Sequence, residues 1–197
     1  PIDTDFWKKS DIEIEDPCTF LFISAGSGGD FRKGQDLLVD AFLKLKIKKK
    51  IQLMIVGEYH EIYRPLENCQ NLDVISMGYI YDEMSLKALI NRSSCVLAPS
   101  REDNLPLVVM EAISCHTPVI AFNIGGMPEM IVNSRTGFII DPFDINSYAK
   151  AMEEILAGFR GVATEYDTFR DKHSNRNIGR TLEKILCSFM TSKEILN

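Results

Sequence analysis

Two acidic residues, Asp103 and Glu111, stand out because of the segment that joins them. Asp103 lies in a polar loop after an apolar stretch, and Glu111 follows on a helical segment with seven residues between the two. Pro106 marks the start of this helix, so the amides of Leu107 and Val108 lack intrahelical partners and carry the positive end of the dipole. Such amides suit a phosphate, and a carboxylate further along can accept hydrogen bonds from two sugar hydroxyls. The pattern predicts a nucleotide or nucleotide-sugar site.

The segment continues into Cys115-His116-Thr117-Pro118-Val119. It resembles the signature of family four of the retaining GT-B glycosyltransferases, which reads Glu, seven residues, Glu, then Cys-Gly-Thr-Pro-Val. The first acid here is Asp103, and its neighbour Glu102 is the other candidate for that role. His116 replaces a helix-terminating glycine at a position that often requires positive φ. We therefore expect a structural rather than a catalytic role for His116.

The two ends of the chain extend this resemblance. The start, Pro-Ile-Asp-Thr-Asp-Phe-Trp, is similar to the linker that joins the two domains of GT-B enzymes. The resemblance implies a linker remnant at 1–17, a nucleotide-sugar-binding domain at 18–174, and a terminal helix at 175–197. In the family that helix crosses back to the N-terminal domain, which is absent here. The chain is thus interpreted as the second half of a two-domain enzyme.

Short apolar segments alternate with amphipathic ones along the chain. Each apolar segment is rich in Val, Ile, Leu or Phe without polar alternation, which is typical of strands covered on both faces. The pattern predicts an α/β fold, a doubly wound, Rossmann-like parallel sheet of about six strands with helices on both faces. The expected strands are 19–24, 52–56, 72–77, 95–98, 119–122 and 137–140, and the expected helices include 34–46, 82–91, 146–156 and 175–190.

The glycine-rich loop at 25–34 joins the first strand to its helix and ends in Lys33-Gly34. The family has the same Lys-Gly pair there, and the resemblance implies that Lys33 binds the donor diphosphate. An arginine is usual six residues earlier, where this chain has Ser27. Arg32 is a candidate replacement, since a guanidinium can bond two phosphate oxygens.

Further loops follow other strands at the carboxyl edge, where open α/β sheets bind ligands. The resemblance places Gly57-Glu58 beside the cleft, the nucleotide base against Tyr79 and Ile80, and the loop 125–129 at the cleft floor. It implies that Glu111 holds the ribose and that Asp103 contacts the donor sugar. The predicted catalytic residues are Asp103, Lys33 and Arg32, and the predicted donor-binding residues are Ser27, Gly57, Glu58, Tyr79, Ile80, Glu102, Asn104, Leu107, Val108 and Glu111.

The composition limits the other classes of partner. The net charge of −6 argues against nucleic acid. Five cysteines without paired spacing indicate free thiols, largely buried, in a reducing cytoplasm. The histidines show no metal-ligand spacing, and Asp3 and Asp5, although spaced like a metal motif, lie in the linker. The basic run 44–50 is interpreted as cations at a helix C-terminus, with an anionic membrane surface as the alternative.

Together these features predict the donor-binding half of a retaining hexosyltransferase that needs neither metal nor cofactor. The donor would be a UDP- or GDP-sugar, and the acceptor a hydroxyl of a sugar or lipid-linked glycan. By the same resemblance, bacterial lipopolysaccharide, O-antigen or capsule assembly is the expected setting, in the cytoplasm or at the inner face of the membrane. A non-catalytic nucleotide-binding module and a sugar-nucleotide epimerase remain the alternatives, because the fold alone does not choose.

Overall fold

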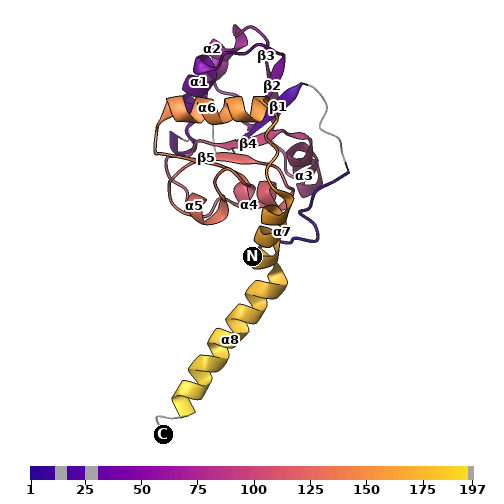
Figure 1. The fold of residues 1–197 in the computed structure, drawn as a ribbon, viewed down its shortest axis with the longest axis vertical. Helices are drawn as coiled ribbons and strands as arrows, with labels where there is room; N and C mark the ends of the chain where they lie inside the picture. The colour runs from indigo at the N-terminus through magenta and orange to yellow at the C-terminus, as the bar shows by residue number, and fades with distance from the viewer. Residues whose placement is uncertain (12–16, 25–30, 195–197) are drawn as a thin grey trace.

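A six-stranded parallel sheet forms the centre of the molecule (Figure 1). The computed structural model describes residues 1–11, 17–24 and 31–194. The strand order β3-β2-β1-β4-β5-β6 reverses direction between β1 and β4, as in the dinucleotide-binding arrangement. The strands are β1 (Cys18–Ser24), β2 (Ile51–Gly57), β3 (Leu72–Gly78), β4 (Cys95–Ala98), β5 (Val119–Phe122) and β6 (Gly137–Ile140). The predicted doubly wound, Rossmann-like fold is confirmed.

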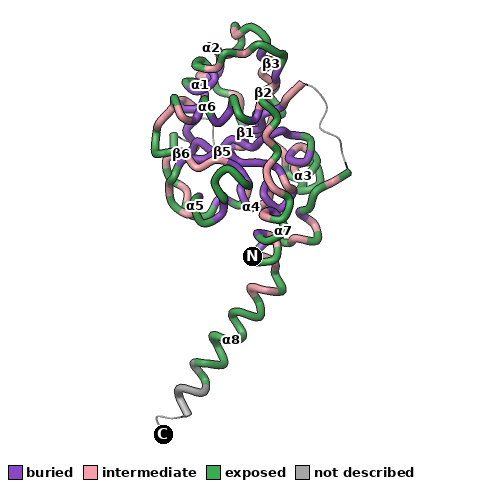
Figure 2. Tube along the Cα trace, viewed as in Figure 1, coloured by how far each residue is buried: buried purple, intermediate pink, exposed green. Residues whose placement is uncertain are grey.

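Helices cover both faces of the sheet because the side chains of each strand alternate between them. Phe20 and Phe22 belong to one buried cluster, with α1, α2 and α6, whereas Leu21 belongs to a second cluster with α3, α4, α5 and α7. Figure 2 shows that the buried part of the chain is concentrated around the sheet. The helices are α1 (Gln35–Lys44), α2 (Arg64–Glu67), α3 (Glu83–Arg92), α4 (Leu107–Ser114), α5 (Met127–Met130), α6 (Ile145–Leu156), α7 (Ala163–His173) and α8 (Asn175–Glu194).

Three details differ from the sequence predictions. The first helix ends at Lys44, so Lys46, Lys48, Lys49 and Lys50 lie in the connection to β2 and not at a helix end. The interpretation of the basic run as helix-terminal cations is therefore wrong for all but Lys44. Helix α7 was not predicted, because only two of its side chains, Tyr166 and Phe169, are buried. All five cysteines are free, but only Cys95 and Cys115 are buried.

The N-terminal segment 1–11 packs against α3 and α7. Ile2 and Trp7 are buried in the second cluster. The Ile2 amide donates to the carbonyl of His173 at 3.0 Å, and the Ser10 amide donates to Oδ1 of Asn91 at 2.7 Å. Arg170 adds a 2.7 Å hydrogen bond from Nη2 to the Thr4 carbonyl. This segment is therefore held to the domain at both ends.

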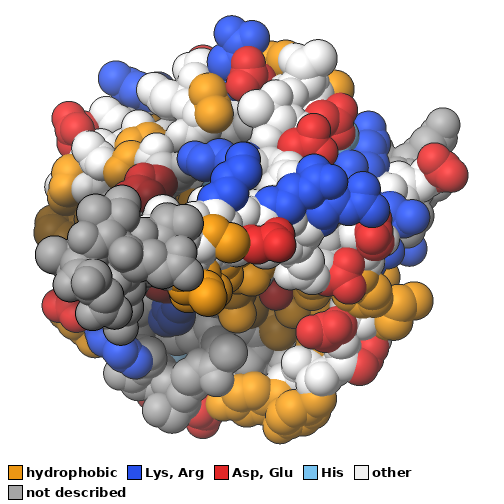
Figure 3. Space-filling model, turned by 90° about the horizontal axis from the view of Figure 1, so that it is seen from below, with side chains coloured by type: hydrophobic (Ala, Val, Ile, Leu, Met, Phe, Trp, Pro, Cys, Tyr) orange, Lys and Arg blue, Asp and Glu red, His pale blue; other side chains and the backbone are white. Residues whose placement is uncertain are grey.

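Helix α8 leaves the domain and extends away from it as a single long helix (Figure 1). Its apolar side chains Leu182, Ile185, Leu186 and Met190 are exposed. Figure 3 shows hydrophobic side chains uncovered on the face seen from below. Within the described part of the chain, no helix combines the length and hydrophobicity that spanning a membrane requires.

Candidate functional site

Two of the predicted site residues, Lys33 and Asp103, meet at the carboxyl edge of the sheet, beside the point where β1 and β4 adjoin. Helix α4 begins there after Pro106, which supplies no side-chain cap. The amides of Val109 and Met110 donate to the Pro106 carbonyl, whereas those of Leu107 and Val108 make no hydrogen bond with any described residue. Two backbone donors at the positive end of α4 are thus available to an anion.

Lys33 and Asp103 form an ion pair directly at this edge. The Lys33 Nζ lies 2.9 Å from Oδ2 of Asp103, and the two side chains are 29% and 16% exposed. They are 70 positions apart, and they meet because the parallel strands β1 and β4 are neighbours. Glu102, the other candidate for the first acid, is exposed and is not the partner of Lys33. The geometry therefore favours Asp103 over Glu102.

Arg101 is a residue that sequence reasoning missed. Its guanidinium forms a bidentate ion pair with Asp36, donates to the Phe31 carbonyl at 3.0 Å, and lies 3.7 Å from the centre of the Phe31 ring. Its backbone amide donates to the Arg32 carbonyl at 2.7 Å. The hydrogen bond from Arg101 holds the pKa of Asp36 below its usual value. Arg101 thus fixes the short 3-10 turn Phe31–Lys33, which presents Lys33 to the site.

Close backbone contacts require glycine at two positions around the site. Gly34 (φ 70°) caps α1, and a Cβ there would overlap the Pro99 carbonyl at the end of β4. Gly125 (φ 54°) lies against the backbone of Asp103, where a Cβ would overlap the carbonyl oxygen. Positive φ also favours glycine at both positions. The predicted cleft-floor loop therefore supports the segment that carries Asp103.

Glu111 lies on α4 beyond the free amides and is half-buried. Its carboxyl group makes no hydrogen bond or ion pair with the described residues. Burial raises its pKa to about 7, and the nearby carboxylate of Glu83 adds to the rise. A buried carboxylate without partners is costly, so hydroxyl donors supplied by a ligand would stabilise its ionised form.

The remaining predicted residues are placed as follows. Gly57 is buried at the end of β2, and Glu58, Arg32 and Asn104 are exposed. Tyr79 and Ile80 line a hollow of about 600 Å³ beside α3, where the rings of Tyr79 and Tyr81 stack with centroids 6.1 Å apart. Ser27 lies outside the described residues. The predicted roles of these side chains stay predictions.

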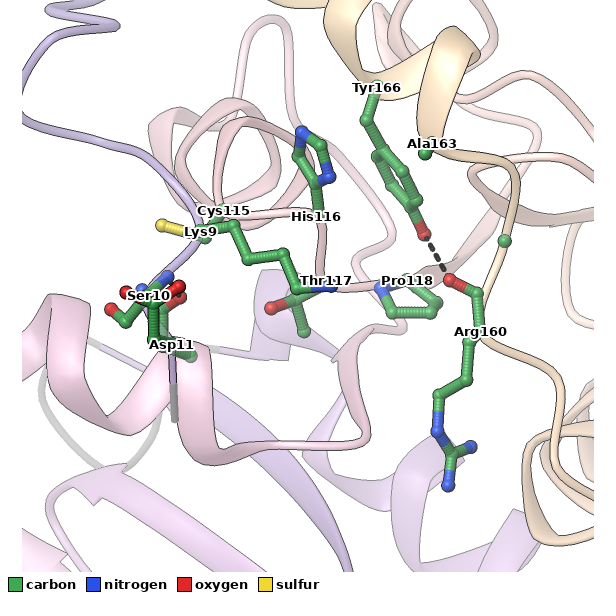
Figure 4. Close-up of a pocket in the computed structure, with 12 residues that line it drawn as sticks. Lys9, Ser10, Asp11, Cys115, His116, Thr117, Pro118, Arg160, Ala163 and Tyr166 are labelled. Atoms are coloured by element: carbon green, nitrogen blue, oxygen red, sulfur yellow. Dashed lines mark hydrogen bonds between the residues drawn. The ribbon is translucent and has the colours of Figure 1, made fainter. Parts of the chain in front are cut away.

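His116 lies away from this edge, before the amino end of β5. It has φ 58°, as expected at a glycine position. Its Nε2 lies 3.1 Å from Oδ1 of Asp167, and its ring stacks on Tyr166 at 5.0 Å. Figure 4 shows both rings beside a hollow of about 710 Å³. Burial lowers the pKa of His116. These contacts join α4 to α7, which supports the structural role.

Comparison with known families identifies the class of protein to which this chain belongs. The family described as "Glycosyl transferases group 1" matches residues 18–158, most of the chain. The chain belongs to this glycosyltransferase family. Two curated proteins are similar to it in sequence. The N-acetyl-alpha-D-glucosaminyl L-malate synthase of Bacillus anthracis is 26% identical over 83% of this chain and 41% of its own length. An uncharacterized 41.2 kDa protein from a Klebsiella pneumoniae cps region is 30% identical over 63% of this chain and 34% of its own length.

Solved structures share the fold of this glycosyltransferase chain at about one-fifth sequence identity. Sucrose-phosphate synthase from Thermosynechococcus elongatus aligns with TM-score 0.78 at 20% identity, covering 97% of this chain and 51% of its own. HepE from Anabaena, solved with UDP-glucose, aligns with TM-score 0.72 at 18% identity. This alignment covers 95% of this chain and 56% of HepE. The C-terminal domain of LpcC from Francisella tularensis aligns with TM-score 0.74 at 18% identity, and the alignment covers 89% of this chain and 100% of that domain. The chain thus spans about half or less of its full-length relatives.

The described residues of this glycosyltransferase chain contain no group of three or more His, Cys, Asp or Glu side chains placed to hold a metal ion. Lys33 and Arg32 are cations of the turn at the carboxyl edge, and Arg101 packs against the same turn.

Proposed function

We propose that this chain is the donor-binding half of a retaining GT-B glycosyltransferase, and that the donor is a nucleoside diphosphate sugar. The observation that carries the proposal is the meeting of Lys33 and Asp103 beside the free amides of α4. A cation and two backbone donors at one point suit a diphosphate, and the adjacent carboxylate suits a sugar hydroxyl.

Donor binding would proceed by exchange of partners. The diphosphate takes Lys33 away from Asp103 and accepts hydrogen bonds from the amides of Leu107 and Val108. Asp103, released from the ion pair, accepts hydrogen bonds from the donor sugar. Glu111 accepts from the two ribose hydroxyls, and the base lies against Tyr79 and Ile80. The ion pair between Lys33 and Asp103 is thus replaced by contacts from each of these side chains to the donor.

The chemical task is to stabilise the charge that develops on the departing diphosphate. Lys33 and the α4 dipole supply a positive field at this point. Arg32, an exposed residue of the same turn as Lys33, adds to this field. This field needs no metal ion and no cofactor. Arg101 does not touch the donor; it positions the turn from behind.

The wider activity is part of the same proposal. The UDP-glucose complex of HepE supports a UDP-sugar over a GDP-sugar, and the cps-region relative supports a role in bacterial surface polysaccharide assembly. The acceptor, a sugar or lipid-linked glycan, would bind mainly to an N-terminal domain, against which the apolar side of α8 would pack. The complete enzyme would work in the cytoplasm, at the inner face of the membrane.

Calorimetric titration of the chain with UDP and GDP, in EDTA, tests this function. We expect saturable binding of at least one nucleoside diphosphate, which Lys33→Ala weakens more than tenfold, since a charge-assisted hydrogen bond contributes about 1.5–3 kcal/mol. Lys172→Ala, an exposed lysine of α7, is the matched control. A folded chain that binds neither nucleotide would overturn the proposal.

A further inference from the structure

The basic run 46–50, displaced from the helix end, forms one wall of a pocket. The pocket has a volume of about 500 Å³. The opposite wall comes from the last turn of α6 and the segment that follows it. The lining cations are Lys46, Lys48, Lys49, Lys50 and Arg160. The two walls meet only in the tertiary structure, because about 100 residues separate them in sequence.

This pocket is separate from the proposed donor site. Cys18 and Ile51, which line it, are the first residues of β1 and β2, whereas the donor site lies at the carboxyl ends of the strands. Each of these strands has seven residues, so the two sites lie roughly 20 Å apart. A ligand of one site therefore does not reach the other.

Positive charge in the pocket is only partly compensated. Lys50 pairs with Asp73 at 3.0 Å, and Glu153 is the acidic residue of the lining. The C-termini of α1 and α6 each add about half a negative charge. Counted over the described residues, five cations thus leave roughly two positive charges uncompensated, on a chain whose formal net charge is −6. A local excess of opposite sign to the whole chain favours an anionic ligand.

Arg160 is held in place by the end of α6. Its Nη1 donates to the carbonyls of Phe159 at 2.9 Å and Ile155 at 3.4 Å. Figure 4 shows its side chain directed away from His116 and Tyr166, while its carbonyl accepts the Tyr166 hydroxyl. A fixed guanidinium can bond two oxygens of one phosphate group.

The rest of the lining is apolar. Ile51 and Ile155 are buried at the base, and Leu156 and Cys18 are half-buried beside them. Cations at the rim and aliphatic side chains below match a phosphate group attached to an apolar or glycerol-like moiety.

We propose that this pocket binds a phosphate-type anion carried on a partly apolar molecule. Two sources share this chemistry, the headgroup of an anionic phospholipid and a small phosphorylated metabolite. The inference does not depend on the proposed donor site, because none of its residues lines this pocket.

Vesicle co-sedimentation tests the lipid source. The chain is mixed with vesicles of phosphatidylcholine alone, or of phosphatidylcholine and phosphatidylglycerol in equal parts. We expect binding to the anionic vesicles only, weakened by added salt. Each lysine near an anionic surface contributes about 1 kcal/mol, so removing one lowers the partition coefficient roughly fivefold. The triple variant Lys46→Gln, Lys48→Gln, Lys49→Gln should lose at least tenfold.

The control variant carries the same change of charge elsewhere, at Lys8, Lys172 and Lys184, which are exposed and outside the pocket. Titration with glycerol 3-phosphate tests the soluble source, in the Lys33→Ala background to remove the donor site. Binding of either probe that the pocket variant loses and the control retains supports the proposal. If neither probe binds, or if the two triple variants behave alike, the proposal is wrong.

Discussion

Replacing Glu111 by Gln should strengthen the fold and weaken the site at the same time. Burial, with help from Glu83, raises the pKa of Glu111 from 4.5 to about 7. Between these values the folded chain holds a proton at Glu111 that the unfolded chain has released. The unfolding free energy of the wild type therefore falls as pH rises through this window, and Glu111 causes no further change above it. The glutamine side chain of the variant has nearly the shape of the protonated acid but does not titrate, so the variant does not lose this stability.

The size of the effect follows from the shift. A change from 4.5 to about 7 corresponds to at most about 3 kcal/mol of unfolding free energy, and partial exposure reduces it. Near pH 4.5, at the lower edge of this window, the difference in stability between the variant and the wild type should be smallest. Near pH 8.5 the variant should be more stable, with a melting temperature roughly 4–10 °C higher for a chain of this size.

Thermal and urea unfolding of both proteins across pH 4.5–8.5 measures this difference. Glu83→Gln is a second test variant. Removing the Glu83 carboxylate should lower the pKa of Glu111 and so reduce, in part, the pH dependence of the unfolding free energy. If wild type and Glu111→Gln keep the same stability difference at every pH, Glu111 does not titrate in this window, and the argument from burial fails.

The same variant separates stability from binding. The ionised carboxylate accepts two hydroxyl hydrogen bonds, so UDP affinity of the wild type should rise with pH through about 7. The phosphate of UDP also titrates near pH 6 and changes the affinity. The Glu111→Gln protein measures this effect of the phosphate separately, because its residue 111 does not titrate. Above pH 8 we expect the variant to bind UDP tenfold or more weakly, because a charged hydrogen bond contributes about 1.5–3 kcal/mol.

Further predictions concern the rest of the site. Asp103→Asn should tighten UDP binding severalfold, since the diphosphate no longer competes with Asp103 for Lys33; weaker binding in calorimetry would place Asp103 on the nucleotide. Arg101→Lys should raise the Kd for UDP about tenfold with little change in melting temperature, because lysine cannot make the bidentate contact to Asp36; an unchanged Kd would show that Arg101 does not position Lys33. Gly125→Ala should lower the unfolding free energy by more than the roughly 1 kcal/mol expected for Gly78→Ala, which also has positive φ but open space around it; equal losses would contradict the close contact with Asp103. The 197-residue chain should transfer no sugar from UDP-glucose, whereas we expect a complete two-domain enzyme to transfer it in EDTA; turnover by the chain alone would refute the half-enzyme proposal.

The sequence by itself determined the class of fold and predicted a site at the carboxyl edge of the sheet. Runs such as 95–98 and 119–122 are apolar throughout, which is how strands buried on both faces must look, and both were predicted with the bounds that the structure has. Pro106 marked the start of the helix that carries Glu111, through the constraint that proline places on the backbone. These signals are local, so they survive without knowledge of distant contacts.

The tertiary structure decided which residues meet. The pairing of β1 with β4 brings Lys33 to Asp103 and Arg101 to Asp36, across about 70 positions, and no local pattern specifies such partners. Helix α7 escaped prediction because it packs through two aromatic side chains rather than a continuous apolar stripe. The pocket around Lys48 likewise exists only where the end of α6 faces the start of β2. The ion pairs, the burial of each side chain and the raised pKa of Glu111 depend on these long-range contacts, and for that reason they were visible only in the folded chain.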